Sequence, residues 1–285
     1  MRIAWVTDST AFVPNQSGSG GNDIYVVPMS ILFGEKEYMD GIDLSPEELF
    51  AKLRNEKVEV KTSQPSIGRF KELFEQLSRD YDYIFSIHVS SHFSGTFSSA
   101  YQAAELLKDT TPNISCIDSK ILSNPLTELI QYGQRLSGEG KDPVQIKEAI
   151  EERIRSCETY VMVGSLEQLH KSGRMGGLSF FLGSVLKIKP MLSIEDGKLK
   201  VEDKVRSIKK GLSSMSHQLD LALANRSIGK VSVLHGLNRE DALEWMEQLR
   251  QAYPEIEFGA YPLGAVIGVH AGENTIGISW YSENM

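Results

Sequence analysis

Cysteine is scarce in this sequence of 285 residues, which contains only Cys116 and Cys157. A single pair without close C-x-x-C spacing excludes a disulfide-stapled scaffold and a cysteine-ligated metal site. We expect both side chains to be small buried apolar groups. Because disulfide chemistry is missing, we expect the reducing cytoplasm as the location.

Long apolar runs and an excess of positive charge are also missing. The longest apolar stretches, residues 24–33 and 260–269, are interrupted by proline or glycine and fall short of the roughly 20 residues that span a membrane. The N-terminal apolar stretch is broken by Asp8, which argues against a signal peptide. Acidic residues exceed basic ones by 38 − 30 = 8. That balance argues against a nucleic acid partner and against more than transient contact with an anionic membrane.

Known catalytic signatures are absent as well. The sequence has no G-x-x-x-x-G-K-[ST] phosphate loop, no G-x-G-x-x-G turn after its first strand, no H-E-x-x-H and no G-x-S-x-G. We therefore expect no metal, no cofactor and no complete active site. What is present is ordinary globular composition, with 41% hydrophobic and 24% charged residues. At roughly 150 residues per domain, the length predicts about two domains.

The first half alternates predicted strands with predicted helices, which is typical of a parallel sheet covered on both faces. Ser45, Pro46 and Glu48 form a capping box that predicts a helix to about Asn55. The other predicted elements are strands Ile3–Val6, Ile24–Met29, Tyr83–Val89 and Ile114–Ile117, a turn at Gly34-Glu35, and helices after Ser66, through Tyr101, over Leu126–Leu136 and over Pro143–Cys157.

The second half mixes strands, helices and hairpin signals. Asp196-Gly197 predicts a hairpin turn. The predicted strands are Tyr160–Val163, Met191–Ile194, Val231–Leu234, Ile256–Tyr261, Val266–Val269 and Ile276–Trp280, and the predicted helices are Leu166–His170, Ser207–Ala224 and Glu240–Gln251. We therefore expect an α/β fold of two domains. An α/β/α domain with a mainly parallel sheet spans residues 1–157, and a two-layer α/β domain with a mixed sheet spans residues 158–285.

Two turns rich in hydroxyl groups stand out. Ser90–Thr96 lies between a predicted strand and a predicted helix, where backbone N–H groups favour an anion. Ser94 or Thr96 could equally cap its own helix. Thr62–Pro65 is a stiff connector, since Pro65 favours an extended backbone at the residue before it. Its alternative interpretation is a simple helix-entry turn.

His270 and Arg206 are isolated polar residues with two interpretations each. His270 precedes a glycine turn and is either structural or ligand-binding, and Arg206 is either a solvated charge or a functional cation. Ser94, Asp118 and His270 also occur in the chain order of an α/β hydrolase triad. Because any chain of this size offers many such triplets, the order alone carries little weight.

Several short pieces together resemble a known family. They are Thr7–Thr10, Asp40–Leu44, Thr62–Ser66, Ser94–Thr96, Asp118–Lys120, Gly173-Arg174, Leu186–Leu192, Arg206 and His270. In this order they are similar to the DegV family, bacterial fatty-acid-binding proteins that present acyl chains to a separate fatty acid kinase. Each piece is weak alone, but the ordered set covers essentially the whole chain.

The resemblance implies a DegV-like fold with the lipid site between and within the two domains. It implies that Thr62, Ser94 and His270 hold the fatty acid carboxylate, with Arg206 at the rim serving phosphoryl transfer with the kinase. Possible additional head-group contacts are Ser63, Gly95 and Thr96.

The free energies of alkyl burial and of hydrogen bonding indicate which part of such a ligand would supply most of its affinity. Burying roughly fourteen methylenes at ~0.8 kcal/mol each stabilises the complex by about 11 kcal/mol. A hydrogen bond to a charged group contributes only about 1.5–3 kcal/mol. The candidate lining residues of an acyl-tail tunnel are Phe180, Phe181, Leu182, Val185, Leu186 and Met191. Their alternative interpretation is ordinary core.

Two pieces depart from the family pattern. Asn124-Pro125 replaces a glycine-rich helix start, and Ala271-Gly272-Glu273 replaces a more glycine-rich turn and brings a carboxylate. We also expect Arg174, Lys187 and Lys189 to form a basic docking patch for the kinase. Two alternatives stay open: a small-carboxylate hydrolase or phosphotransferase using Ser94 and His270, and a lipid carrier or sensor without kinase coupling.

Overall fold

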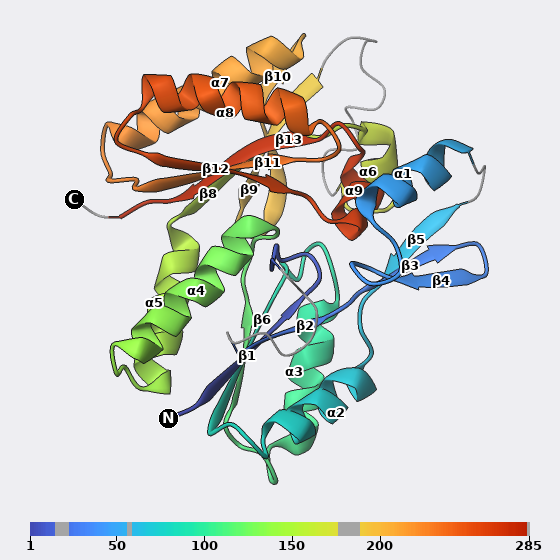
Figure 1. Cartoon of the computed structure of the whole chain (residues 1–285), viewed down its shortest axis with the longest axis vertical. Helices are drawn as coiled ribbons and strands as arrows, with labels where there is room; N and C mark the ends of the chain where they lie inside the picture. The colour runs from blue at the N-terminus through green and yellow to red at the C-terminus, as the bar shows by residue number, and fades with distance from the viewer. Residues whose placement is uncertain (15–22, 56–58, 176–188, 284–285) are drawn as a thin grey trace. The chain divides into compact units, whose positions relative to one another are not determined.

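The computed structural model describes residues 1–14, 23–55, 59–175 and 189–283 (Figure 1). The chain divides into two compact units. The first comprises residues 1–154 with 264–266, and the second comprises residues 155–263 with 267–285. Each is described separately below.

The first unit is built on a parallel sheet with strand order β2-β1-β6-β7. Every neighbouring pair is parallel, as the alternation of strands and helices predicted. The strands are β1 (Ile3–Asp8), β2 (Ile24–Val27), β6 (Tyr83–His88) and β7 (Ile114–Asp118).

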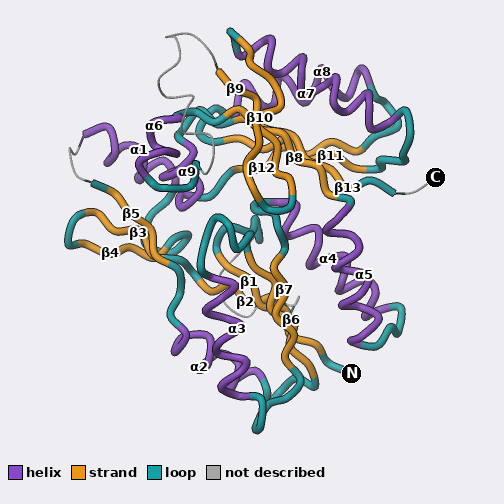
Figure 2. The backbone as a smooth tube through the Cα atoms, turned by 180° about the vertical axis from the view of Figure 1, so that it is seen from behind, coloured by secondary structure: helices purple, strands orange, loops and turns teal. Residues whose placement is uncertain are grey.

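Helices cover both faces of this sheet (Figures 1 and 2). They are α2 (Ile67–Leu77), α3 (Thr96–Leu107), α4 (Asn124–Gly138) and α5 (Pro143–Arg155). Ala4 and Val6 of β1 pack with Phe70 and Phe74 of α2. Trp5 points to the other face, where a Cβ added to Gly133 of α4 would lie 2.5 Å from the Trp5 ring. Successive side chains of β1 therefore point alternately to the two faces of the sheet and pack against the helices on each face.

A small antiparallel sheet of order β4-β3-β5 also belongs to this unit. Its strands are β3 (Ser30–Phe33), β4 (Lys36–Met39) and β5 (Val60–Ser63), and helix α1 (Pro46–Asn55) lies between β4 and β5 in the chain. The predicted capping box is confirmed: Ser45 Oγ accepts from the Glu48 amide at 3.2 Å, and Glu48 accepts from the Ser45 amide at 2.9 Å.

The second unit has a six-stranded mixed sheet of order β10-β9-β8-β13-β11-β12. Only β11 and β12 pair in parallel among its described neighbours. The elements are β8 (Cys157–Met162), α6 (Leu166–Lys171), β9 (Lys189–Glu195), β10 (Lys198–Val205), α7 (Ile208–Leu223), β11 (Lys230–His235), α8 (Arg239–Ala252), β12 (Glu257–Pro262), α9 (Ala265–Ala271) and β13 (Ile276–Tyr281). The first two residues of α9, Ala265 and Val266, belong to the first unit.

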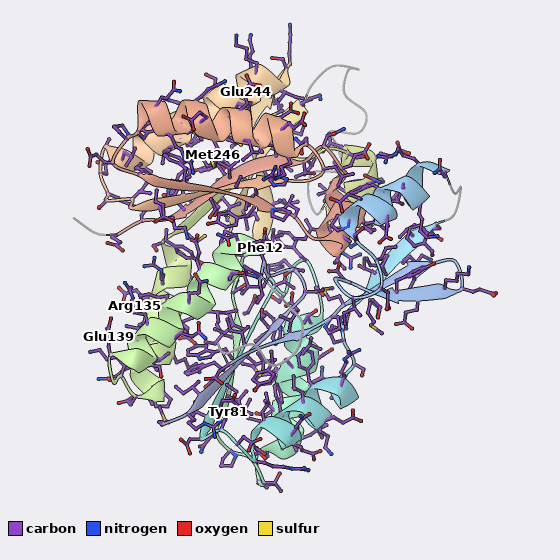
Figure 3. All side chains as sticks on the ribbon, viewed as in Figure 1. Phe12, Tyr81, Arg135, Glu139, Glu244 and Met246 are labelled. Atoms are coloured by element: carbon purple, nitrogen blue, oxygen red, sulfur yellow. The ribbon has the colours of Figure 1, made fainter. Side chains whose placement is uncertain are left out.

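Helices α7 and α8 lie together on one face of this sheet (Figures 1 and 2). Their apolar side chains form a core with the strands, in which Met215, Trp245 and Trp280 are buried. Figure 3 shows how α8 is amphipathic: Met246 points toward the sheet and Glu244 points away. The predicted hairpin is confirmed, since β9 and β10 are joined through Asp196 and Gly197, both with positive φ.

Two predictions about elements are wrong. Residues 266–269 form part of helix α9 instead of a strand. A short apolar run fits either element, and here helix hydrogen bonds satisfy the backbone. The helix predicted over Pro143–Cys157 ends at Arg155, and Cys157 starts strand β8 by pairing with Tyr281.

Candidate functional site

The carboxyl ends of β1 and β6 lie side by side at the middle of the parallel sheet. From β1 the chain continues to β2 on one side, and from β6 it continues to β7 on the other. The two following loops therefore diverge at this point, which is where open α/β sheets bind ligands. The polar pieces Thr7–Thr10 and Ser90–Thr96 both lie here.

Asp8 is the fully buried centre of this region. Its carboxylate accepts hydrogen bonds from the Thr10 amide at 3.1 Å and hydroxyl at 2.6 Å, and from the Val89 amide at 2.9 Å. His88 Nδ1 lies 3.1 Å from Asp8 Oδ2. Burial raises the pKa of Asp8, but the hydrogen bond and charge of His88 and the other donors outweigh it, so that the pKa is lowered overall.

His88 also contacts Ser86, whose Oγ lies 2.6 Å from Nε2. Ser86, His88 and Asp8 thus have the connectivity of a catalytic triad. All three side chains are fully buried, so the chain of hydrogen bonds supports the sheet instead of meeting a substrate. Sequence reasoning missed it, because three separate positions on two strands give no recognisable spacing.

Ser94, Gly95 and Thr96 form the start of helix α3. Ser94 Oγ lies 2.8 Å from the Thr96 hydroxyl and accepts from the Thr96 amide at 3.3 Å. The residue at the N-cap position, Gly95, has no side chain to cap the helix. Ser94 is 9% exposed. Its hydroxyl therefore satisfies one amide of the first turn, and the helix dipole favours negative charge at this end.

The Thr62–Gln64 piece reaches the same turn. Thr62 and Ser63 end strand β5, with Thr62 paired to Ile31. The amide of Gln64 packs so closely on Gly95 that a Cβ there would lie 2.5 Å from Gln64 Nε2. The structure thus brings together two of the turns that the sequence singled out. Thr62 is half-buried, and Ser63 Oγ donates to the Gln64 carbonyl at 3.3 Å.

In the second unit, His270 is the sixth residue of α9. Burial, followed by the positive charge of Arg174, lowers its pKa to about 4. The imidazole is therefore neutral at pH 7, with one ring nitrogen as donor and the other as acceptor. Burial also lowers the pKa of Arg174, and its Nη1 donates to the Ser172 carbonyl at 2.5 Å.

The turn after His270 is tightly packed. Gly272 has a φ of +88°, and a Cβ on it would lie 2.8 Å from the Ser165 amide nitrogen. That amide donates to the Ala271 carbonyl at 2.9 Å. The backbone carbonyl of Glu273 accepts from Leu237 at 2.7 Å. These contacts hold the end of α9 against the start of α6.

The remaining candidate residues lie elsewhere in the chain. Arg206 is exposed and directly precedes Ser207, whose hydroxyl caps α7. Asp118 accepts hydrogen bonds from the amide and hydroxyl of Ser91 at 3.0 and 2.5 Å, so it orders the loop after β6. Asn124 is buried and donates to Glu128 within α4.

Most of the tail candidates fall outside the part of the chain that the structure describes. These are Phe180, Phe181, Leu182, Val185 and Leu186, together with the docking candidate Lys187. Met191 is described: it is fully buried on β9, in the core cluster that includes Met215 and Trp245. Lys189 is exposed at the start of the same strand.

Over the described residues, no group of three or more metal-type ligands comes together. In that same part of the chain, no helix has the length and apolarity to cross a membrane.

Comparison with known proteins covers nearly the whole chain. A DegV family model, described as uncharacterised, matches residues 2–283. A DegV domain-containing protein of Halalkalibacterium halodurans is 34% identical over 99% of both chains. The crystal structure of DegV from Bacillus subtilis, described as a fatty acid binding protein, superposes with a TM-score of 0.87 at 33% identity, over 99% of this chain and 100% of that one. A DegV family protein of Eubacterium eligens, loaded with heptadecanoic acid, gives a TM-score of 0.85 at 25% identity, over 99% and 100% of the two chains. The fold and the polar turns identified above are therefore those of a protein that belongs to the DegV family.

Proposed function

We propose that this protein binds a long-chain fatty acid and presents its carboxylate to a separate fatty acid kinase, which forms the acyl phosphate. Fatty acid binding is supported by the relatives described above. The observation that carries the proposal in this chain is the packing of Gln64 on Gly95. It unites the two hydroxyl-bearing turns, Thr62–Ser63 and Ser94–Thr96, at the N-terminus of α3.

The head group would be held by neutral donors. In the proposal the hydroxyls of Thr62 and Ser94 and the imidazole of His270 bind the carboxylate, with Ser63, Gly95 and Thr96 as neighbouring contacts. The N-terminal end of a 12-residue helix adds favourable potential for an anion. Because the low pKa of His270 keeps its imidazole neutral, the imidazole can donate a hydrogen bond without neutralising the ligand.

Neutral donors suit a carboxylate that must react. In the proposed transfer, a carboxylate oxygen attacks the γ-phosphorus of ATP on the kinase. A C–O–P linkage forms, and the bond to the β-phosphate oxygen breaks as ADP leaves. A tight ion pair would withdraw electron density from the attacking oxygen, whereas hydrogen bonds orient it. Arg206, which is exposed, would neutralise the incoming phosphoryl charge.

Affinity would come from the acyl tail. Removing an alkyl chain of about fourteen methylenes from water stabilises the complex by about 11 kcal/mol before ordering costs. The hydrogen bonds at the carboxylate contribute about 1.5–3 kcal/mol each. We therefore expect the head-group residues to set the orientation of the ligand more than its retention.

The first test is native mass spectrometry of the protein purified from cells, followed by lipid extraction. We expect a fatty acid bound in a stoichiometric amount relative to the protein. Recovery of water-soluble ligands alone, or of none, would contradict the proposal.

The second test replaces Thr62 and Ser94 with Ala and measures acyl-phosphate formation with a cognate kinase. We expect the rate to fall at least tenfold, which corresponds to about 1.4 kcal/mol. Ser98→Ala is the matched control, because Ser98 is exposed on the same helix as Ser94. Unchanged rates in both test variants would remove these residues from the site.

The alternatives differ in what the isolated chain does. Ester hydrolysis that is lost in Ser94→Ala would indicate an enzyme with its own active site. The partner 2.8 Å from the Ser94 hydroxyl is the Thr96 hydroxyl, which is not a general base, so we expect no such activity. Ligand retention without any acyl phosphate would indicate a carrier or sensor.

A further inference from the structure

The segment Asp40–Asp43 has no role in the proposed ligand contacts, yet Asp40 is one of the most buried carboxyl groups among the residues that the structure describes. Asp40 is 2% exposed. Its amide donates to the Met29 carbonyl at 2.9 Å, and a β-bridge joins it to Leu44. The backbone therefore fixes the place of this carboxyl from both sides.

The carboxyl of Asp40 meets the start of helix α9. It accepts hydrogen bonds from the hydroxyl of Ser9 and from the backbone N–H groups of Val266 and Ala265. These amides belong to the first turn of α9, where an N–H group has no partner within its helix. Asp40 thus performs the task of an N-cap from a segment more than 200 positions away in the sequence.

The residue before the helix, Gly264, lies beside the same two segments. A Cβ on Gly264 would lie 3.4 Å from the Ser9 carbonyl oxygen and 3.8 Å from Asp40 Oδ2. Ser9 is held in turn, because its Oγ accepts from the Met29 amide at 3.1 Å. One hydrogen-bonded group therefore connects the loop after β1, the segment around Asp40 and the start of α9. All of these residues belong to the first unit.

Helix α9 has only seven residues, and His270 is the sixth. So short a helix has little stability of its own, and its position depends on caps and packing. We propose that Asp40 is a positioning residue for His270: it anchors the first turn of α9 and so determines where the imidazole stands. This inference rests on the proposed role of His270 in binding a carboxylate.

At pH 7 the charge on Asp40 costs the fold stability, because a carboxyl whose pKa is raised by folding ionises more easily in the unfolded chain. Burial raises its pKa to about 6, against the lowering effect of Ser9 and Val266, and the negative charge of Asp8 raises it further. Its Oδ2 is buried and has no hydrogen-bond partner among the described residues. If the Asp40 side chain contributed only to stability, a neutral side chain of the same shape would stabilise the fold equally well. We therefore expect Asp40→Asn to fold as stably as the original chain at pH 7 while holding α9 less firmly.

The test compares Asp40→Asn with Asp43→Asn in the full chain. Asp43 is exposed in the same loop, where its carboxylate accepts from the Met39 amide at 2.8 Å. Three quantities are measured: the urea midpoint of unfolding, the side-chain NMR signals of histidine in the ligand-free chain, and the Kd for palmitate. His270→Gln identifies the signal of the proposed ligand-binding imidazole.

For Asp40→Asn we expect an unchanged or higher urea midpoint, a shifted or broadened His270 signal, faster hydrogen exchange over residues 265–270, and a Kd for palmitate raised about three- to tenfold. Asp43→Asn leaves all of these as in the original chain. An unaltered His270 signal with unaltered exchange in Asp40→Asn would overturn the inference.

The outcomes separate this inference from the proposed function. If the original chain does not bind palmitate, the proposed function fails, and the NMR and exchange measurements still decide the role of Asp40. If Asp40→Asn does not fold, Ser9→Ala replaces it, since it removes one donor to the carboxyl and leaves the charge. The same changes at His270, smaller in size, are then expected, and their absence would overturn the inference.

Discussion

Asp8 and His88 form a fully buried pair in which Nδ1 of the imidazole lies 3.1 Å from Oδ2 of the carboxylate. The two residues end adjacent parallel strands, so the pair joins the loops that follow both strands. Because an ionised carboxylate only accepts hydrogen bonds, Nδ1 carries the proton. The geometry of the Ser94 turn, six residues after His88, thus depends on a polar group in the core.

Asp8→Asn is expected to destabilise the fold by about 3 kcal/mol at pH 7, because it removes a buried carboxylate that accepts hydrogen bonds from Thr10, Val89 and His88. The pKa of Asp8 is lowered from 3.8 in the folded state. Its charge therefore stabilises the fold above that value, and this contribution is lost as the pH falls through the folded pKa. Urea unfolding at pH 7 and pH 3 should show a large difference from the original chain that shrinks in acid. A constant difference would contradict the assignment, and Asp43→Asn is the exposed control.

Arg174→Gln is expected to raise the pKa of His270 without restoring it to 6.5. The reason is that burial lowers this pKa more than the charge of Arg174 does. Because the folded value of about 4 lies below 6.5, the neutral imidazole is compatible with the fold at pH 7, and stability is lost as the pH falls from about 6.5 toward 4. NMR titration of the His270 ring checks the first expectation. A pKa that does not respond to Arg174→Gln would show that burial alone sets it.

Gly95→Ala is expected to displace the side chain of Gln64, whose amide nitrogen would lie 2.5 Å from the new Cβ. Gln64 is exposed and can move, so we expect a stability change within about 1 kcal/mol but weaker fatty acid binding. The double variant with Gln64→Ala should recover stability and tell whether the lost affinity came from the displaced amide. Additive effects on stability in the double-mutant cycle would mean that the two residues do not interact.

Gly272→Ala and Gly173→Ala form a matched pair. Both glycines have positive φ, +88° and +75°, but only at Gly272 does a Cβ meet a neighbour, the Ser165 amide at 2.8 Å. We expect Gly173→Ala to cost about 1 kcal/mol for the left-handed backbone, and Gly272→Ala to cost clearly more. Chemical denaturation checks this, and equal losses would mean that the turn after His270 relaxes freely.

Local patterns in the sequence were sufficient where neighbours in the chain decide the structure. The capping box at Ser45–Glu48 and the Asp196-Gly197 hairpin follow from hydrogen bonds and backbone angles within a few residues. The parallel sheet follows from the alternation of apolar strands and amphipathic helices. The resemblance to the DegV family rested on ordered short pieces, and the family comparison confirms it.

The sequence alone did not predict the contacts between segments that are far apart in the chain. Residues 266–269 form a helix whose first turn is capped by Asp40, and no local pattern near Ala265 encodes that partner. The pairing of β5 with β3 likewise turns an expected connector into a strand.

By itself, the amino-acid sequence determined the α/β class and the local turns and caps, because these depend on periodicity and on residues close along the chain. The resemblance to the family came from short pieces in a fixed order along the whole chain. Only the tertiary structure decided that Gln64 lies on Gly95, that Ser86, His88 and Asp8 form a buried chain, and that Asp40 caps the helix of His270. These relationships join residues that are far apart in the chain, and they form only when packing brings their backbones within hydrogen-bonding distance.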